Sequence, residues 1–411
     1  MSVQLCGIFV QVEQKKFERR LVVLVPVLLD QLAPTSCADD LPGRFVRAVP
    51  VVESSNWSEE EQHQHDHRLF QTLQTINKIC EHCPALLSDA KWSETVQALA
   101  GTSTTSSCDV HLAKWSETVQ ALADNAQLFL AHSHEWVRLA GAQLLGHVFS
   151  SLDPQQIAAA AVSGTGASTG VLLTRPRSEL RSLVLDLCAV LQLGNTLPEL
   201  VEQVIKNLVF LARVLQGVSE QDTQTRDQGA DCAMDDDEDE SRIKISLAWM
   251  IRRMRRIVNT EIIQTPKSTQ LRTAVFKWLG AVAVTLPKSQ LSALLPHLMT
   301  SLVREMMVVE PSGDELRRLA KDVGDVMRRR VGAEEYTRQL ARLQAQLEAR
   351  RTGRKSKRAQ EVITDPERAA KRKIKKHLKK KDFKKKKFDV LKGRKPGKRN
   401  LKRPVKIDDT M

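Results

Sequence analysis

Residues 133–149 read Ser-His-Glu-Trp-Val-Arg-Leu-Ala-Gly-Ala-Gln-Leu-Leu-Gly-His-Val-Phe, and this stretch decides the fold that we predict. Ser133 can cap the start of a helix, and Glu135 suits the positive end of the helix dipole. Apolar residues then recur at helical spacing on one face, namely Trp136, Val137, Ala140, Leu144 and Val148. The small residues Ala140, Gly141, Ala142 and Gly146 allow a neighbouring helix to approach closely.

A second helical stripe precedes this one, and a short corner at residues 132–134 joins the two. Its members are Trp115, Val119, Leu122, Ala126 and Phe129. One such helix cannot bury its stripe alone, so it needs stacked neighbours. The two stripes therefore predict an antiparallel helix pair of the HEAT or armadillo kind. An ordinary helical hairpin in a globular bundle is the alternative.

The rest of the chain repeats the helical pattern and has no segment of strand period. Helical periodicity predicts further helices over 17–32, 68–83, 178–193, 196–218, 241–258, 269–286, 289–309 and 313–350. We therefore predict an all-α fold, a HEAT/armadillo-like helical-repeat solenoid with a disordered or partly helical basic C-terminal tail.

Shifts in composition divide the chain into five parts. These are an N-terminal helix with a polar linker (1–67), helical repeats (68–216), an acidic insertion expected to be disordered (217–240), helical repeats with a long terminal helix (241–350), and a basic tail (351–411). Eleven residues at 90–100 recur letter for letter at 113–123. Such identity indicates a recent duplication or a faulty gene model, and we expect only one copy to pack.

Charge is distributed very unevenly. The chain carries a net charge of +14, but residues 350–411 hold 27 Lys and Arg against 7 Asp and Glu. The first 349 residues are mildly acidic, with 36 basic and 42 acidic residues. A basic arm on a nearly neutral body indicates contact with a nucleic acid. Aromatic residues make up only 4% of the chain, which disfavours a base-stacking platform.

Three patterns raise the possibility of chemistry, and each has a simpler interpretation. His63, His65 and His67, followed by Cys80 and Cys83, suggest zinc, but Cys80 falls on an apolar helix face and no second cysteine pair follows. The glycine-rich residues 164–170 lack the strand and the Lys-Ser/Thr of a phosphate loop. No nucleophile elbow occurs. We expect no metal site, no cofactor and no enzyme activity, and the seven scattered cysteines fit free thiols.

The tail is the most informative segment. Thr364-Asp-Pro-Glu367 reads as a capping box with Pro366 in the first turn, after which Ala370, Ile374 and Leu378 recur every four residues. Basic residues cover the remaining faces, and we predict them as contacts to a nucleic acid, which the resemblance described next implies to be RNA: Lys371, Arg372, Lys373, Lys375, Lys376, Lys379, Lys380, Lys381, Lys384, Lys385, Lys386 and Lys387. A nuclear localisation signal alone and a merely solvated tail are the alternatives.

Four segments carry a resemblance to a known family. They are residues 136–146 (Trp-Val-Arg-Leu-Ala-Gly-Ala-Gln-Leu-Leu-Gly), 275–284 (Val-Phe-Lys-Trp-Leu-Gly-Ala-Val-Ala-Val), 294–299 (Leu-Leu-Pro-His-Leu-Met) and the tail at 363–377. In this order, with the acidic insertion among them, they resemble the C-terminal region of the down-regulated-in-metastasis family. That family is also called the U-three small nucleolar RNA-associated protein twenty family. Its members have a much longer N-terminal solenoid. The sequence therefore leaves two questions open: whether this chain is a partial gene product or a complete protein, and whether it folds alone.

The resemblance implies a HEAT-repeat component of the small-subunit processome, acting in the nucleolus. We expect a non-catalytic scaffold in ribosome biogenesis that serves the processing of pre-18S rRNA. Its partners would be processome proteins and pre-ribosomal RNA or small nucleolar RNA, with no membrane and no small-molecule substrate. The alternative is a nuclear HEAT-repeat adaptor that binds proteins and whose basic tail is only a localisation signal.

Overall fold

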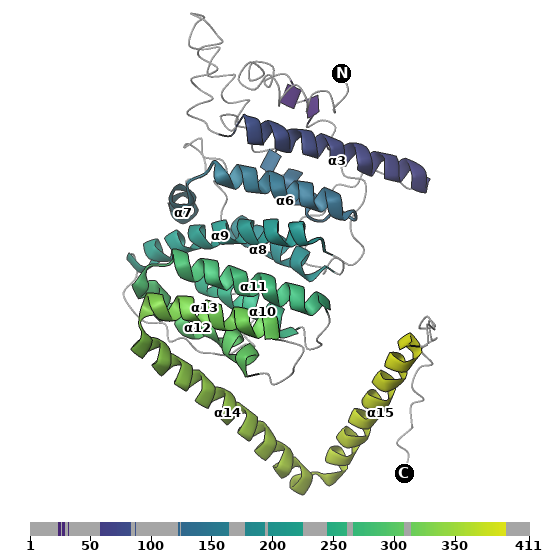
Figure 1. Ribbon diagram of the computed structural model, residues 1–411, viewed down its shortest axis with the longest axis vertical. Helices are drawn as coiled ribbons and strands as arrows, with labels where there is room; N and C mark the ends of the chain where they lie inside the picture. The colour runs from purple at the N-terminus through teal and green to yellow at the C-terminus, as the bar shows by residue number, and fades with distance from the viewer. Residues whose placement is uncertain are drawn as a thin grey trace, which may run out of the picture. The chain divides into compact units, whose positions relative to one another are not determined.

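The computed structural model of the 411-residue chain is shown in Figure 1. It describes residues 24–25, 27–28, 32, 58–83, 87, 122–123, 125–163, 177–193, 196–224, 245–260, 266–307 and 314–391. The chain forms two compact units, Met1–Leu340 and Ala341–Met411. Each unit is described by itself.

Every regular element of the described residues is an α-helix, so the predicted all-α class is confirmed. The helices are α3 (Glu59–His82), α6 (Glu135–Ser150), α7 (Pro154–Ser163), α8 (Arg177–Gln192), α9 (Pro198–Gln224), α10 (Leu247–Thr260), α11 (Pro266–Thr285), α12 (Lys288–Met306), α13 (Asp314–Val331), α14 (Ala333–Thr364) and α15 (Pro366–Leu391).

Apart from α7, which packs on α9, helices α3 to α13 of the first unit stack in two rows (Figure 1). In one row α3, α6, α9, α11 and α13 contact one another in that order, and in the other α8, α10 and α12 do so. Cross-contacts join the rows, since α8 packs on α9, α10 on α11, and α12 on α13. The helices of the two rows thus bury apolar residues against helices close to them in the chain, as in a helical-repeat fold.

Close packing around α6 confirms the prediction from its small residues. A Cβ atom at Gly141 would lie 2.9 Å from Cβ of Phe129, so only hydrogen fits there. On either side of Gly141, buried asparagines of the neighbouring helices donate to carbonyl oxygens of α6. The Asn77 amide donates to the Ala140 oxygen (3.0 Å) and the Asn207 amide to the Ala142 oxygen (2.8 Å). These bonds fix the register of α3 and α9 against α6.

The start of α6 differs from the prediction in two respects. Its N-cap is His134, not Ser133, and no side chain caps the helix. The Ser133 and His132 carbonyl oxygens instead accept hydrogen bonds from the buried Arg138 guanidinium, 2.7 Å each, which holds the corner outside the helix. Trp136 was predicted in the buried stripe but is 45% exposed, and it meets Phe70 edge to face at 6.2 Å.

Two predicted linkers are shorter than expected because helices extend into them. Helix α3 begins at Glu59 instead of residue 68. Ser58 and Glu61 form a reciprocal capping box, and the three glutamates of the first turn stabilise the positive end of the helix dipole. The backbone N–H of Ser58 donates to the Glu61 carboxylate (2.8 Å), which lowers the pKa of that carboxyl. Helix α9 continues to Gln224, so residues 217–224 are helical and do not belong to the predicted insertion.

The predicted long terminal helix at 313–350 is two helices, α13 and α14, separated by Gly332. The backbone of Gly332 has a φ of +112°, a conformation that side-chain-bearing residues rarely adopt. Its N–H donates to the Arg328 oxygen, and its own oxygen accepts from the Tyr336 N–H, so it closes one helix and opens the next. Periodicity alone did not reveal this break because glycine also occurs inside helices.

Several predictions lie outside the described residues. They concern most of the helix at 17–32, nearly all of the duplicated segments at 90–100 and 113–123, the acidic residues 225–240, and the tail after 391. Within the part of the chain that is described, no helix has both the length and the apolar character needed to cross a bilayer.

Candidate nucleic-acid interface

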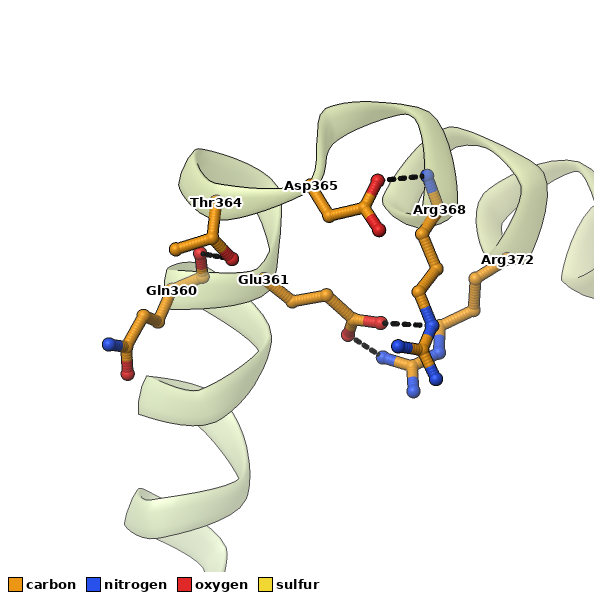
Figure 2. Close-up of polar contacts among 6 residues, drawn as sticks. All are labelled: Gln360, Glu361, Thr364, Asp365, Arg368 and Arg372. Carbon is orange, nitrogen blue, oxygen red and sulfur yellow. Dashed lines mark hydrogen bonds and ion pairs between the residues drawn. The ribbon is translucent and has the colours of Figure 1, made fainter.

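The second unit contains a sharp corner between α14 and α15, and its local chemistry explains the break (Figure 2). Pro366 has no backbone N–H and disfavours helical geometry at Asp365, so α14 stops at Thr364. The Asp365 carboxylate then caps α15 by accepting from the backbone N–H of Arg368 (2.9 Å). The predicted helix start and the place of Pro366 are confirmed. The cap, however, is Asp365 and not Thr364, whose hydroxyl donates back to the Gln360 oxygen (3.0 Å).

Glu361, in the last turn of α14, faces two arginines of α15 across this corner. Figure 2 shows its carboxylate pointing toward the Arg368 and Arg372 guanidinium groups, with one contact to each. The Glu361–Arg368 ion pair measures 3.8 Å, and Arg372 is both ion-paired and hydrogen-bonded to the same carboxylate. Both arginines remain largely exposed, at 76% and 59% of their side chains, whereas Glu361 is mostly covered. One carboxylate therefore orients two guanidinium groups without removing them from solvent.

A hollow of about 670 Å³ lies at this corner. Five basic side chains and two carboxylates are among its lining residues: Arg354, Lys357, Arg358, Gln360, Glu361, Thr364, Asp365, Arg368 and Arg372. The surplus of positive charge makes the hollow suited to an anion. Arginine guanidinium groups match phosphate oxygens with two parallel hydrogen bonds, so phosphate is the anion that this lining favours.

The predicted contact residues all fall on α15. The described side chains among them, Lys371, Arg372, Lys373, Lys375, Lys376 and Lys381, are exposed. For Lys379, Lys380 and residues 384–387 the structure places the backbone in α15 and does not describe the side chains. The corner residues Arg354, Lys357, Arg358 and Arg368 were not in the predicted set, although they belong to the same basic block of sequence.

Two of the predicted contacts are already paired with carboxylates of the arm. Lys371 forms an ion pair of 2.7 Å with Glu367, one turn earlier, and this hydrogen bond and charge raise the pKa of Lys371 above its usual value. Arg372 is held by Glu361. Lys373, Lys375 and Lys376 have no carboxylate partner among the described residues, so their charges are available to a polyanion.

The other sequence patterns considered for chemistry are the Cys80–Cys83 pair, the three histidines and the glycine-rich stretch. Cys80 and Cys83 are buried free thiols, and burial, reinforced by Cys83, raises the pKa of Cys80 to about 12. His63, His65 and His67 lie on α3 and not in a linker. Among the residues that the structure describes, no three His, Cys, Asp or Glu side chains gather as a metal site would require. The glycine-rich residues 164–170 fall outside them.

A comparison with protein families matches most of the chain. The model described as "small subunit processome component 20 homolog, C-terminal" covers residues 46–390. The matched range includes the two rows of helices, the α14–α15 corner and nearly all of α15.

Proposed function

This chain belongs to the family of small subunit processome component 20 homologues, and we propose that it is a non-catalytic scaffold of the small subunit processome. Its stacked helices would bind processome proteins, and its basic C-terminal arm, residues 350–391, would contact pre-ribosomal RNA. The work would take place in the nucleolus and serve the processing of pre-18S rRNA. The exposed positive charge of the arm is the observation that carries the RNA contact.

The arm is poorly suited to stand alone. Helix α15 has 26 residues, about 39 Å of helix at 1.5 Å per residue. Lysines one turn apart repel each other, and only the Lys371–Glu367 and Glu361–arginine pairs offset that repulsion among its described residues. A phosphate backbone would neutralise these charges and relieve the repulsion. Binding would also release counterions, which favours the complex.

The contact would read backbone and shape instead of sequence. Residues 350–391 contain no Trp or Tyr, and their two aromatic residues are Phe383 and Phe388. Lysine and arginine contacts to phosphate position a protein on a nucleic acid and carry no base information of their own. Double-stranded RNA, whose bases are hard to reach, is recognised in this way.

The arm's role is tested with a chain that ends at Thr364, because this truncation removes α15 at its natural break. We expect the truncated chain to lose most of its affinity for an RNA duplex, measured by fluorescence anisotropy at fixed salt. An unchanged affinity would remove the arm from the proposal.

The same truncation separates the proposal from a protein-binding adaptor. A foreign nuclear localisation signal is attached to the truncated chain, and its sedimentation with pre-ribosomal particles is compared with that of the full chain. We expect a nuclear protein that associates poorly with the particles. Full association would mean that the arm serves only as a localisation signal.

A further inference from the structure

A pocket in the first unit is separate from the basic arm. It lies between the first half of α3 and the start of α6, has a volume of about 310 Å³, and is lined by His63, Asp66, His67, Phe70, His134 and Trp136. Two aromatic rings with a single carboxylate are the lining that organic cations prefer. We propose that this pocket binds an arginine side chain of a basic protein partner.

The carboxylate of Asp66 is the first part of the argument. Asp66 is only 8% exposed, and its Oδ1 accepts no hydrogen bond from the described residues. Nε2 of the buried His132 lies 3.5 Å from this oxygen. Nδ1 of His132 accepts from the His134 backbone N–H (3.0 Å), which leaves Nε2 as the ring nitrogen that can donate toward Asp66. The buried Asp66 carboxyl thus makes one long contact, to the His132 imidazole, and a buried carboxyl with so few hydrogen-bond donors favours a cationic partner.

The aromatic rings are the second part. Trp136 is 45% exposed at the mouth of the pocket, and its ring centroid lies 6.2 Å from that of Phe70. Trp136 thus remains partly exposed beside a cavity, whereas other apolar residues of α6 are buried in the core. A cation over an indole face gains electrostatic attraction, and a guanidinium can also stack on it.

The charge around the pocket and the arrangement of its side chains indicate which kind of cation would bind. Glu59, Glu60 and Glu61 occupy the first turn of α3, just before His63, which favours a basic segment over an acidic one. A metal ion is disfavoured because no three donor side chains converge among the described residues. Arginine is favoured over lysine because its planar guanidinium can stack on an aromatic ring while its N–H groups point toward the carboxylate.

The test is a ligand-observed NMR titration of the full chain with N-acetyl-arginine amide. N-acetyl-citrulline amide serves as the matched ligand, because it has nearly the same shape and no charge. We expect saturable binding of the arginine compound and binding weaker by about tenfold or more for citrulline, since hydrogen bonds between charged groups are the stronger ones. Equal affinity for the two ligands would overturn the proposal.

Two variants assign the binding to this pocket. Asp66→Asn and Trp136→Ala should each weaken arginine binding by about tenfold, whereas the matched acid-to-amide change Glu202→Gln, at an exposed position of α9, should leave it unaltered. Because Asp66→Asn also alters the contact to His132, the exposed Trp136 provides the variant that spares the fold. Undiminished binding by Trp136→Ala would overturn the proposal. A gain in affinity on removing residues 366–411 would identify the chain's own tail as the occupant and overturn the assignment to a partner.

Discussion

Two glycines in helix interiors provide matched substitutions with opposite expected effects. Gly141 lies in α6, where an added Cβ would meet Phe129 Cβ at 2.9 Å and the Ala126 carbonyl oxygen at 3.1 Å. Both are nearly rigid, so the methyl group must displace the backbone. Gly280 lies in α11, where an added Cβ would meet the Val323 side chain at ordinary contact distances, 3.4 Å to Cγ2 and 3.8 Å to Cγ1. Ala replaces Gly in both variants, and only the surroundings differ.

The magnitudes follow from two opposing effects. Alanine is favoured over glycine inside a helix by about 0.8–1.0 kcal/mol. An extra methyl group in a tightly packed site costs about 1–3 kcal/mol. Gly280→Ala should therefore stabilise the protein by about 1 kcal/mol, whereas Gly141→Ala should lower its stability by up to about 2 kcal/mol. The two variants should differ by roughly 1–3 kcal/mol.

Urea unfolding followed by far-UV circular dichroism measures both variants under identical conditions. At constant m value, a shift of the midpoint reports the change in stability. A Gly141→Ala variant as stable as Gly280→Ala would refute the close packing of α6 against the helical residues 125–129. It would also undermine the argument that the small residues at 140–142 specify the stacking.

Three further predictions concern the thiols, the histidines and the corner. Cys80 should resist iodoacetamide at pH 8 until urea unfolds the chain, as peptide mass spectrometry would show, because its pKa of about 12 leaves almost no thiolate; prompt labelling of the folded protein would contradict this. Burial, then the charges of Arg255 and Arg252, lower the pKa of His297, so the unfolded state binds more protons. Stability should therefore fall as the pH drops through about 6.5 and below, and less so in His297→Gln, which chemical denaturation at several pH values would detect. Glu361→Gln should raise RNA affinity by about 3- to 10-fold by freeing two arginines for phosphate, whereas lower affinity would mean that orienting them matters more.

The sequence allowed the helical class and most helix positions to be predicted because burial in this protein follows helical periodicity. The stripe containing Val137, Ala140, Leu144 and Val148 is buried as predicted. The wrong predictions concern features that depend on local contacts, and local contacts follow no periodic pattern in the sequence. Trp136 has the right spacing but lies at the end of the helix next to Phe70, and Gly332 ends α13 through a backbone conformation that its letter does not reveal.

The candidate interface was predicted in composition but not in shape. A count of charges identifies the basic block, and the motif around Pro366 predicts the start of α15. The pairing of Glu361 with Arg368 and Arg372 depends on the angle at which two helices meet, and a linear pattern does not contain that angle. For the same reason the basic residues at the end of α14 were missed, and so was the pocket between α3 and α6.

The central claim is that the exposed lysines of α15 contact phosphate. The variant Lys373→Gln/Lys375→Gln/Lys376→Gln removes three such charges, and Lys277→Gln/Lys288→Gln/Lys321→Gln removes three exposed charges from α11, α12 and α13. RNA affinity is measured for both variants and the unmodified chain across a salt series. If all three α15 lysines contact phosphate, the slope of log affinity against log salt should decrease in magnitude by roughly 2–3 for the α15 variant alone. A slope equal to that of the unmodified chain, or an equal loss in the body variant, would contradict the account.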